Sequence, residues 1–265
     1  MQPTWKEIEQ YAKEWVIEAG ESIKEALEGS FQIKTKSNPD DLVTDVDKST
    51  EAFLYNQITS TFPDHRFLGE EGVSEGIEDL EGIVWIVDPI DGTMNFVHQK
   101  QNFAISIGIY ENGVGKIGIV YDVMKGELFH ANDEEGLFVN EKKVTKQTER
   151  PLHEAILGVN SNWLLEDRPY QPELVQLAQK CRGTRSYGSA ALEMAYVAVD
   201  RMDAYISFNL SPWDYAGGAV LLEQAGCKAT RFTNEDLSFL EKGTVIAAKK
   251  QLHEIVVQQL QEGSQ

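Results

Sequence analysis

The stretch that decides both the fold and the chemistry of this chain is Gly82-Ile83-Val84-Trp85-Ile86-Val87-Asp88-Pro89-Ile90-Asp91-Gly92-Thr93. Its first six residues are mostly β-branched or aromatic, a pattern typical of a short strand that is buried on both faces. Asp88 follows directly, and Pro89 fixes its own φ angle and lacks a backbone donor, so we expect the chain to turn at this proline. The Gly92-Thr93 step can then begin a helix.

The acids of residues 88–93, the metal loop, allow two interpretations. Mg²⁺ takes carboxylate and backbone carbonyl oxygens together, so Asp88, Asp91 and the carbonyl of Ile90 can form a cation site. A phosphate group could then bind the unpaired amides of Gly92 and Thr93 at the start of the helix. An Asp-Pro pair followed by Asp-Gly is equally an ordinary turn, and turn chemistry alone would explain each residue type.

Three other acidic segments bear on this choice. Gly69-Glu70-Glu71-Gly72 follows an apolar stretch, although an isolated Glu-Glu pair is usually an exposed turn. Ser211-Pro212-Trp213-Asp214 begins a helical run and has the residue types of a capping box, and the helix dipole favours an ionised carboxylate at that end. In the segment 41–51, Asp47 is expected at the N-cap of a helix that runs to about Thr59.

Taken together, these four segments resemble the inositol monophosphatase family. They are Asp-Leu-Val-Thr-x-x-Asp at 41–47, Gly-Glu-Glu at 69–71, Trp-Ile-x-Asp-Pro-Ile-Asp-Gly-Thr-x-Asn-Phe at 85–96, and Trp-Asp-x-Ala-Gly at 213–217. Gly188-Ser189-Ala190-Ala191 also resembles the family's glycine-small-alanine segment, so the likeness covers nearly all of the 265 residues. It implies a homodimer and a layered α-β-α-β-α sandwich of the inositol monophosphatase and fructose-1,6-bisphosphatase type. The residue pattern alone predicts only a mixed α+β and α/β fold.

The resemblance implies a set of Mg²⁺ ligands. Glu70, Asp88 and the Ile90 carbonyl would bind a first ion, while Asp88, Asp91 and Asp214 would bind a second. A third, weaker ion would contact Glu70. Carboxylates a few ångströms apart raise one another's pKa and resist ionising together, so such a cluster is expected only with bound cations.

The resemblance also implies the catalytic groups and the reaction. Glu70, and Thr93 paired with Asp47, would orient and deprotonate a water molecule that attacks the phosphate, without a covalent phosphoenzyme. Bound cations would polarise the phosphoryl oxygens and stabilise the leaving alkoxide. The implied enzyme is a phosphoric monoester hydrolase that converts inositol-1-phosphate to inositol and phosphate, and that Li⁺ inhibits.

Substrate contacts are implied for the metal loop and for the segment ahead of a later helix, where small side chains let the backbone approach closely. The implied substrate-binding residues are Asp91, Gly92, Thr93, Gly188, Ser189, Ala190 and Asp214. Ser207 departs from the pattern, because inositol-directed members usually carry a glutamate seven residues before the Trp-Asp aspartate. Arg185 could contact a second phosphate through its planar fork, or form a structural ion pair or an interface contact.

Two alternatives remain open. A fructose-1,6-bisphosphatase, a nucleotide 3′-phosphatase or an NADP phosphatase would share the metal site and differ in the substrate pocket. A metal-binding regulatory protein with vestigial activity would belong to another class. Such a protein would be expected to have lost one of the ligand acids or Thr93, and all of them are present.

The composition indicates a folded, soluble, intracellular protein, and its charge supports a metal requirement. The chain carries 24 Lys or Arg and 43 Asp or Glu, a formal charge of −19. This charge repels a phosphate ester unless bound cations invert the local field, and it argues against nucleic-acid binding, for which a basic patch is expected. No stretch approaches the roughly 20 apolar residues that span a bilayer, and the N-terminus does not resemble a signal peptide. We therefore expect a cytoplasmic protein with no membrane contact.

The periodicity predicts two subdomains. Residues 1–150 would form an α+β unit with an antiparallel sheet and the metal loop, and residues 151–265 an α/β unit that supplies Asp214 and substrate contacts. The expected helices are an N-terminal one to about Leu27 and others over 48–60, 172–180, 189–199 and 214–225. The expected strands after the metal loop cover 103–110, 114–121, 127–131, 155–159, 204–208 and 245–248. The five histidines show no ligand spacing and are expected mostly at the surface.

Overall fold

The structure is a computed structural model that describes residues 3–29, 31–35, 42–74, 76–145 and 147–262. Helices alternate with groups of strands along the chain. Asp41, from the first acidic segment, lies outside these residues. Within them the helices are α1 (Trp5–Glu28), α2 (Asp45–Thr61), α3 (Thr93–Gln99), α4 (Gln171–Lys180), α5 (Ala190–Ala198), α6 (Pro212–Gln224) and α7 (Lys250–Glu262).

The strands form two large sheets and one short hairpin. The seven-stranded sheet contains, in spatial order, β3 (Arg66–Gly69), β4 (Ile83–Asp91), β5 (Ala104–Glu111), β6 (Val114–Asp122), β7 (Glu127–Asn132), β8 (Gly136–Val139) and β9 (Lys142–Lys143). The five-stranded sheet contains β11 (Gly183–Arg185), β10 (Ile156–Val159), β12 (Ala204–Leu210), β14 (Gly243–Ala248) and β13 (Lys228–Thr230). The hairpin pairs β1 (Ile33–Thr35) with β2 (Leu42–Thr44).

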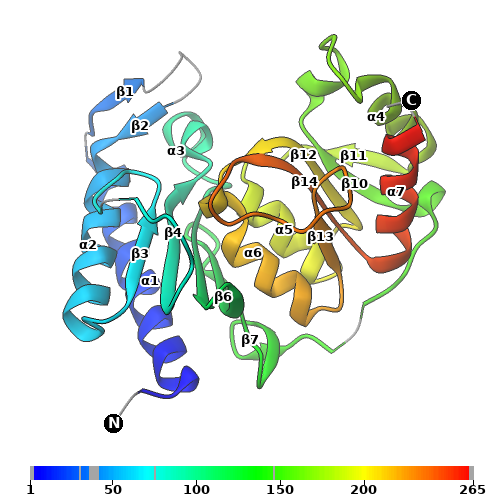
Figure 1. Ribbon diagram of the computed structural model, residues 1–265. Coiled ribbons are helices and arrows are strands. Elements are labelled where there is room, and N and C mark those ends of the chain that lie inside the picture. Colours follow the sequence, from blue (N-terminus) through cyan, green and yellow to red (C-terminus); the bar gives the residue numbers. More distant parts are fainter. Residues whose placement is uncertain (1–2, 30, 36–41, 75, 146, 263–265) are drawn as a thin grey trace.

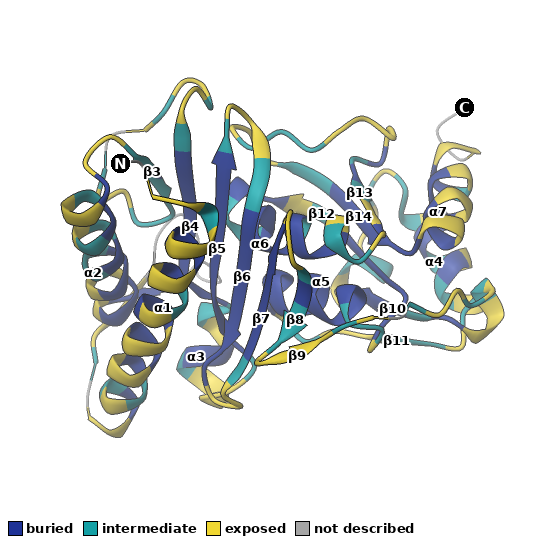
Figure 2. Cartoon of the chain, turned by 90° about the horizontal axis from the view of Figure 1, so that it is seen from below, coloured by how far each residue is buried: buried dark blue, intermediate teal, exposed yellow. Residues whose placement is uncertain are grey.

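These elements pack as five layers (Figure 1). Helices α1 and α2 cover one face of the seven-stranded sheet. Helices α5 and α6 lie between the other face and the five-stranded sheet, and α4 and α7 cover the far face of that second sheet. The strands are buried on both faces in the middle of the molecule, whereas α1 and α2 expose their outer sides (Figure 2). The layered α-β-α-β-α sandwich is therefore confirmed.

Helix α1 illustrates how the sequence builds an outer layer. Thr4 and Glu7 form a capping box at its start, with the Thr4 amide donating to Glu7 Oε2 over 2.8 Å. Apolar residues then recur at helical spacing and are buried against the sheet, namely Ile8, Ala12, Trp15, Val16, Ala19 and Ile23. Burying a large aliphatic side chain of this kind contributes about 1.5–3 kcal/mol, so this face holds the helix on the sheet.

Helix α6 lies directly against the seven-stranded sheet because the sheet carries glycines at the contact. A Cβ atom at Gly108 of β5 or Gly118 of β6 would overlap with the α6 backbone at Ala216 or Gly217. The Tyr110 hydroxyl also donates to the Ala216 carbonyl over 2.9 Å. A helix from the second half of the chain is thereby fixed on the sheet of the first half, with its N-terminal end near the end of β4.

The start of α2 differs from the prediction. Thr44, not Asp47, is the N-cap, because the Thr44 hydroxyl accepts from the amides of Val46 and Asp47. Asp47 stands at the third helical position, where its Oδ2 accepts from the Thr44 amide over 2.9 Å. The two residues form a capping box, so the helix begins at Asp45 rather than at Lys48.

The seven-stranded sheet departs from the prediction in two ways. Its strand β3 pairs with β4 in parallel, so the sheet is not wholly antiparallel. Strand β4 does not turn at Pro89 but continues to Asp91 through a register shift. Proline fits there because a bulge leaves one residue out of the hydrogen-bond ladder.

The prediction that most histidines lie at the surface is wrong. His130 and His253 are buried, His65 is half-buried, and His98 and His153 are exposed. His130 Nδ1 lies 2.6 Å from Glu9 Oε1, and His253 Nε2 lies 2.8 Å from Thr230 Oγ1. Both buried rings have partners within the core, which explains why they can be buried.

The two large sheets fall on either side of residue 150 in the sequence. That residues 1–150 and 151–265 are separate subdomains stays a prediction, since α6 packs on both sheets. Within the described ranges, no helix has the length and apolar character to cross a membrane.

Candidate active site

A β-bulge at the end of β4 places two acids on the same face of the sheet. Asp88 pairs with Ser106 of β5, and Asp91 pairs with Ala104, so three steps along β4 match two steps along β5. Successive residues of a regular strand point to opposite faces, which would separate Asp88 from Asp91. The extra residue turns Asp91 to the face of Asp88.

A third acid comes from the other half of the chain. Asp214 stands in the first turn of α6, where its Oδ2 accepts from the Ser211 amide over 2.7 Å, as the capping-box pattern predicts. One carboxylate oxygen from each of Asp88, Asp91 and Asp214 lies within 4.8 Å of the other two. We call these three residues the acid cluster.

Burial and neighbouring negative charges raise the pKa of each of these acids. Burial, and then the charges of Glu70 and the other two acids, raise the pKa of Asp88 well above its ordinary value. Burial, and then the charge of Asp91, do the same for the pKa of Asp214. Burial raises the pKa of Asp91 to about 6, although hydrogen bonds from Ser189 and Ala191 oppose the shift. A buried, oxygen-only cluster that resists ionisation fits a hard divalent cation such as Mg²⁺.

Thr93 links the metal loop to α2. Its Oγ1 lies 3.2 Å from Asp47 Oδ1 and 3.1 Å from the Ile90 carbonyl oxygen. Burial raises the pKa of Asp47, against the hydrogen bonds that it accepts from Thr44. The structure thus brings Asp47, Thr93 and Ile90 together as expected, while their catalytic and ligand roles stay predictions.

Glu70 lies on the loop after β3, beside the acid cluster. It is not among the three acids within 4.8 Å of one another, but its charge contributes to the raised pKa of Asp47 and of all three cluster acids. Buried Glu51 of α2 holds this loop, since its carboxylate accepts from the Glu71 amide over 2.6 Å and from the Val73 amide over 2.9 Å. Sequence reasoning missed this function of Glu51.

Residues 186–189, which we call the glycine-serine loop, contact the metal loop. Ser189 is the N-cap of α5, and its hydroxyl donates to Asp91 Oδ2. The Ala191 amide donates to the same oxygen over 2.8 Å. These contacts fix the Asp91 carboxylate from the second half of the chain.

The backbone of the glycine-serine loop lies close to the start of α3. The Asn95 side chain donates to the Tyr187 carbonyl over 2.6 Å. Gly92 and Gly188 both have a positive φ, and a Cβ atom on Gly92 would come within 3.1 Å of the Gly188 carbonyl oxygen. Glycine is therefore required where the two loops meet.

A pocket of 220 Å³ opens beside the acid cluster. It is lined by Asp91, Asn160, Trp163, Ser186, Gly188, Ser189, Ala190, Glu193, Tyr205, Leu210 and Asp214. Five of the seven predicted substrate-binding residues line this one cavity, and Gly92 and Thr93 do not. The pocket combines Asp91 of the first half of the chain with residues of the second half.

Ser207 and Arg185, whose roles the sequence left undecided, differ in how far they are buried. Ser207 is fully buried on β12, and its hydroxyl has no hydrogen-bond partner in the described part of the chain. Tyr205, on the same face of that strand, lines the pocket instead. Arg185 is exposed at the end of β11, next to Ser186 of the pocket wall, and its guanidinium donates to the Thr184 carbonyl over 2.8 Å.

Several pocket residues were missed by sequence reasoning. Trp163 and Tyr205 place aromatic rings in the pocket wall, and Asn160 adds an amide. Glu193 had a detectable signal, because it is the sole charged residue of the helix Ala190–Ala198. A charged residue within an apolar helix is expected to have a specific partner.

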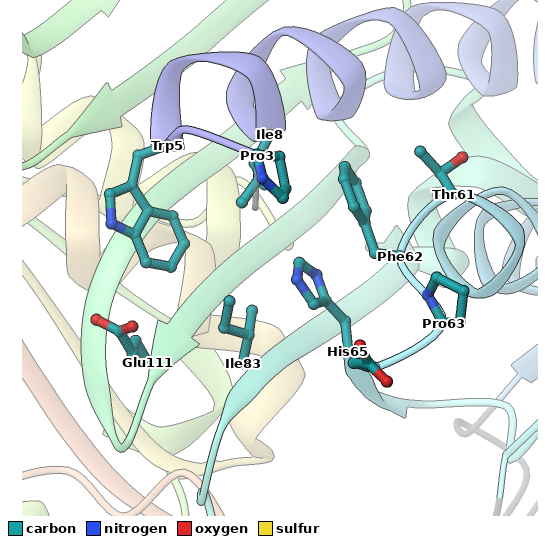
Figure 3. Close-up of a pocket in the computed structure, with 10 residues that line it drawn as sticks. Pro3, Trp5, Ile8, Thr61, Phe62, Pro63, His65, Ile83 and Glu111 are labelled. Atoms are coloured by element: carbon teal, nitrogen blue, oxygen red, sulfur yellow. The ribbon is translucent and has the colours of Figure 1, made fainter. Parts of the chain in front are cut away.

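A larger cavity, of 520 Å³, lies at the opposite end of β4 (Figure 3). The rings of Trp5, Phe62 and His65 surround it, and the Trp85 indole donates to His65 Nδ1 over 3.0 Å. At about 3.3 Å per residue, Ile83 of its wall lies roughly 17 Å along the strand from Asp88. None of the predicted site residues lines this cavity.

Comparisons with known proteins agree with this geometry. The model of the inositol monophosphatase family matches residues 4–265. The inositol-1-monophosphatase of Bacillus subtilis (strain 168) is 52% identical over 96% of this chain and 97% of its own length.

Solved structures agree as well. The crystal structure of inositol monophosphate bound SaIMPase-II is 38% identical, with a TM-score of 0.84 over 94% of this chain and 91% of that one. The structure of an IMPase/NADP phosphatase with Mg²⁺ and phosphate is 27% identical, with a TM-score of 0.89 over 97% and 96% of the two chains. Since the family match includes both loops and all three acids of the cluster, the chain belongs to the inositol monophosphatase family.

Proposed function

We propose that this protein is a Mg²⁺-dependent phosphatase that hydrolyses a small phosphate monoester, with inositol-1-phosphate as the leading substrate. One observation carries the proposal. Asp88, Asp91 and Asp214 come from both halves of the chain and lie within 4.8 Å of one another, and Asp91 and Asp214 line a pocket of 220 Å³. An enzyme that must bind a phosphate despite a net charge of −19 needs such a cation site.

Two or three Mg²⁺ ions would be held by the acids and one carbonyl. The proposed ligands are Glu70, Asp88 and the Ile90 carbonyl for one ion, and Asp88, Asp91 and Asp214 for another, with Glu70 beside a third. Bound Mg²⁺ would supply polarisation of the phosphoryl oxygens and stabilisation of the leaving oxygen. The raised pKa of each cluster acid supports this assignment, since cations would offset the mutual repulsion.

The chain's own groups would prepare the attacking water. Thr93 Oγ1 donates to Asp47, which leaves the lone pairs of that hydroxyl to accept from a water molecule. As the water attacks phosphorus, its proton would pass to Thr93 while the threonine proton passes to Asp47, and Glu70 would hold the water from the other side. The phosphorus–oxygen ester bond would break, the leaving alkoxide would take a proton from a second water molecule, and the products would be the free alcohol and inorganic phosphate.

The pocket would bind the alcohol portion of the substrate. Gly188, Ser189 and Ala190 present backbone and a small side chain to the cavity, which suits hydroxyl groups at close range. The SaIMPase-II relative was crystallised with inositol monophosphate, which supports a polyol phosphate as the ligand. The amides of Gly92 and Thr93 are proposed to contact the phosphate itself.

NADP hydrolysis is a second candidate. Trp163 and Tyr205 line the pocket and could stack on a nucleotide base, and Ser207 replaces the glutamate of inositol-directed members. The IMPase/NADP phosphatase structure belongs to a relative with a very similar fold. The complete set of acids argues against a regulatory protein with vestigial activity.

Phosphate release by the purified protein tests the proposal. The assay compares inositol-1-phosphate, fructose-1,6-bisphosphate, 3′-phosphoadenosine 5′-phosphate and NADP, each with Mg²⁺ and with a chelator. We expect release from inositol-1-phosphate that requires Mg²⁺ and is inhibited by Li⁺. Preference for NADP would support the second candidate, and no release from any compound would contradict both.

Assembly and location are also proposed. We expect a homodimer, measurable by light scattering on the eluate of a sizing column, and a cytoplasmic location, measurable by cell fractionation.

A further inference from the structure

The glycine-serine loop is held from behind by a single buried carboxylate. Glu193 of α5 is 3% exposed. Its Oε1 accepts from the Tyr187 amide over 2.8 Å and from the Gly188 amide over 3.2 Å. Two consecutive amides of the loop therefore depend on one side-chain oxygen.

The other oxygen of Glu193 has no such partner. Oε2 is buried and makes no hydrogen bond to any described residue. It lies over Gly158 of β10, where a Cβ atom would overlap with it, and beside the Tyr205 ring. A buried charge without compensation is costly, and burial raises the pKa of Glu193 to about 7 despite the two amides. The loop thus uses the accepting oxygen Oε1, and a neutral group of the same shape could replace the carboxylate.

The two amides held by Glu193 adjoin the loop's contacts with α3 and with the metal loop. The Tyr187 carbonyl, in the same peptide unit as the Gly188 amide, accepts from Asn95 of α3. The next residue, Ser189, donates to Asp91 of the metal loop. Releasing the amides would free the backbone that makes these contacts, and both contacts would then weaken.

We infer that Glu193 is a positioning residue, which fixes the glycine-serine loop so that Ser189 orients Asp91 and the Gly188–Ala190 backbone lies against the substrate. The loop conformation follows from the contacts above, whereas its effect on turnover rests on the proposed function. Gly158 supports this position of Glu193, because the absence of its side chain leaves the space for Oε2.

The first test compares two substitutions at Glu193. Glu193→Ala removes the acceptor, so we expect kcat/KM for inositol-1-phosphate to fall on the order of ten- to a hundredfold, with a raised KM. Hydrogen exchange in residues 186–191 should accelerate. Glu193→Gln retains an accepting oxygen of the same geometry, and we expect it to restore both kcat/KM and exchange protection to within about threefold of wild type.

Gly158 provides an independent test. Gly158→Ala should displace Glu193 and lower kcat/KM as Glu193→Ala does. In the Glu193→Ala background the same substitution should add little, because the overlapping oxygen is gone and the other atom within 3.0 Å, the Met202 terminal methyl, ends a flexible side chain that can move. A double-mutant cycle measures this coupling, and fully additive losses would contradict the inference.

Glu9→Ala is the matched control. Glu9 is also a helical glutamate that is 3% exposed, and it lies 2.6 Å from His130, outside the acid cluster and the pocket. Its loss should lower thermal stability without changing kcat/KM or loop exchange.

Two results at Glu193 would overturn the inference. One is a Glu193→Gln variant as impaired as Glu193→Ala, and the other is Glu193→Ala with wild-type kcat/KM. If wild type releases no phosphate at all, the proposed function fails, while the exchange data still decide whether Glu193 holds the loop. If Glu193→Ala does not fold, Glu193→Gln and Gly158→Ala still decide the question.

Discussion

Two groups of buried or half-buried acids within the described residues differ in their counter-charges. Asp203 lies 2.7 Å from the ammonium of Lys249 and 2.8 Å from the guanidinium of Arg150, and Asp200 contacts the same two cations. Although burial acts to raise it, hydrogen bonds from Lys249 and Arg150 lower the pKa of Asp200 to about 2, and they also lower that of Asp203. We call these four residues the paired cluster.

The acid cluster of Asp88, Asp91 and Asp214 has the opposite electrostatics. The pKa values of its three acids are raised. At Asp214, the charge of Lys242 opposes this rise. The chain supplies cations to the paired cluster from within, so that cluster is complete as folded. The acid cluster would obtain its counter-charge from the proposed Mg²⁺ ions, and this difference would separate a structural group from a functional one.

Asp88→Asn should have the largest effect, because Asp88 is the ligand shared by both proposed ions. We expect turnover to fall by about 10³-fold or more, with the circular dichroism spectrum retained. Without metal, the variant should be at least as stable as wild type, since one repelling charge is gone. Asp133→Asn, at a surface salt bridge with Lys116, is the control and should keep full activity. Normal hydrolysis by Asp88→Asn would sink the proposed mechanism.

Lys249→Met tests the paired cluster. Lys249 is 1% exposed, and its loss leaves two acids with half of their counter-charge. We expect unfolding free energy to fall by about 3–5 kcal/mol in urea titrations, with kcat/KM of the folded protein unchanged. Lys116→Met, which breaks a partly exposed pair, should cost less than about 1 kcal/mol. Equal losses in the two variants would show that the paired cluster is not structural.

The two clusters should respond to pH with opposite signs when metal is absent. The pKa of Asp91 is raised from 3.8 to about 6, so the folded state keeps a proton that the unfolded state has lost. Stability should fall as pH rises from about 4 to 6, by about 3 kcal/mol for this single group. The pKa of Asp200 is lowered to about 2, so its contribution should be lost as pH falls from about 4 to 2.

Urea unfolding with a chelator measures both trends. The stability difference between wild type and Asp91→Asn isolates the first trend, and the difference between wild type and Asp200→Asn isolates the second. Saturating Mg²⁺ should flatten the first trend and leave the second unchanged. A pH-independent difference for Asp91→Asn would refute the uncompensated acid cluster.

Arg185→Ala should have the smallest effect. It tests whether the Arg185 guanidinium contacts a phosphate of the substrate. Arg185 is exposed next to Ser186 of the pocket wall. We expect KM for inositol-1-phosphate to change less than about twofold, and KM for NADP, which has additional phosphates, to rise about fivefold. Arg182→Ala, exposed nearby, is the control. Equal changes for both substrates would assign Arg185 a structural or interface role.

Much of the acid cluster could be predicted from the sequence, because local rules place its members. The buried strand before Asp88 and the capping box around Asp214 are both present in the structure. The bulge was missed, because Pro89 satisfies the rules for a turn as well as those for a bulge. The displaced N-cap of α2 has a similar cause, since Thr44 and Asp47 are both good capping residues.

The supporting contacts could not be predicted, because they join residues distant in the sequence. The burial of His130 depends on Glu9, 121 positions away, and Glu193 has its role only because Gly158 leaves space for it. The paired cluster likewise joins Arg150 to Lys249 through two acids between them. Such contacts follow from tertiary packing, which hydrophobic periodicity does not specify.

The close packing of α6 on glycines has a consequence for motion. Helices α5 and α6 belong to the cores of both sheets, so a rotation of one half against the other would have to open a continuous apolar interior. We therefore expect this protein to bind substrate and release product without a hinge motion of one half against the other. Only the loops and the bound ions would then respond to the ligand. Selection for glycine at positions 108, 118 and 217 would then preserve the rigidity of the fold as much as its shape.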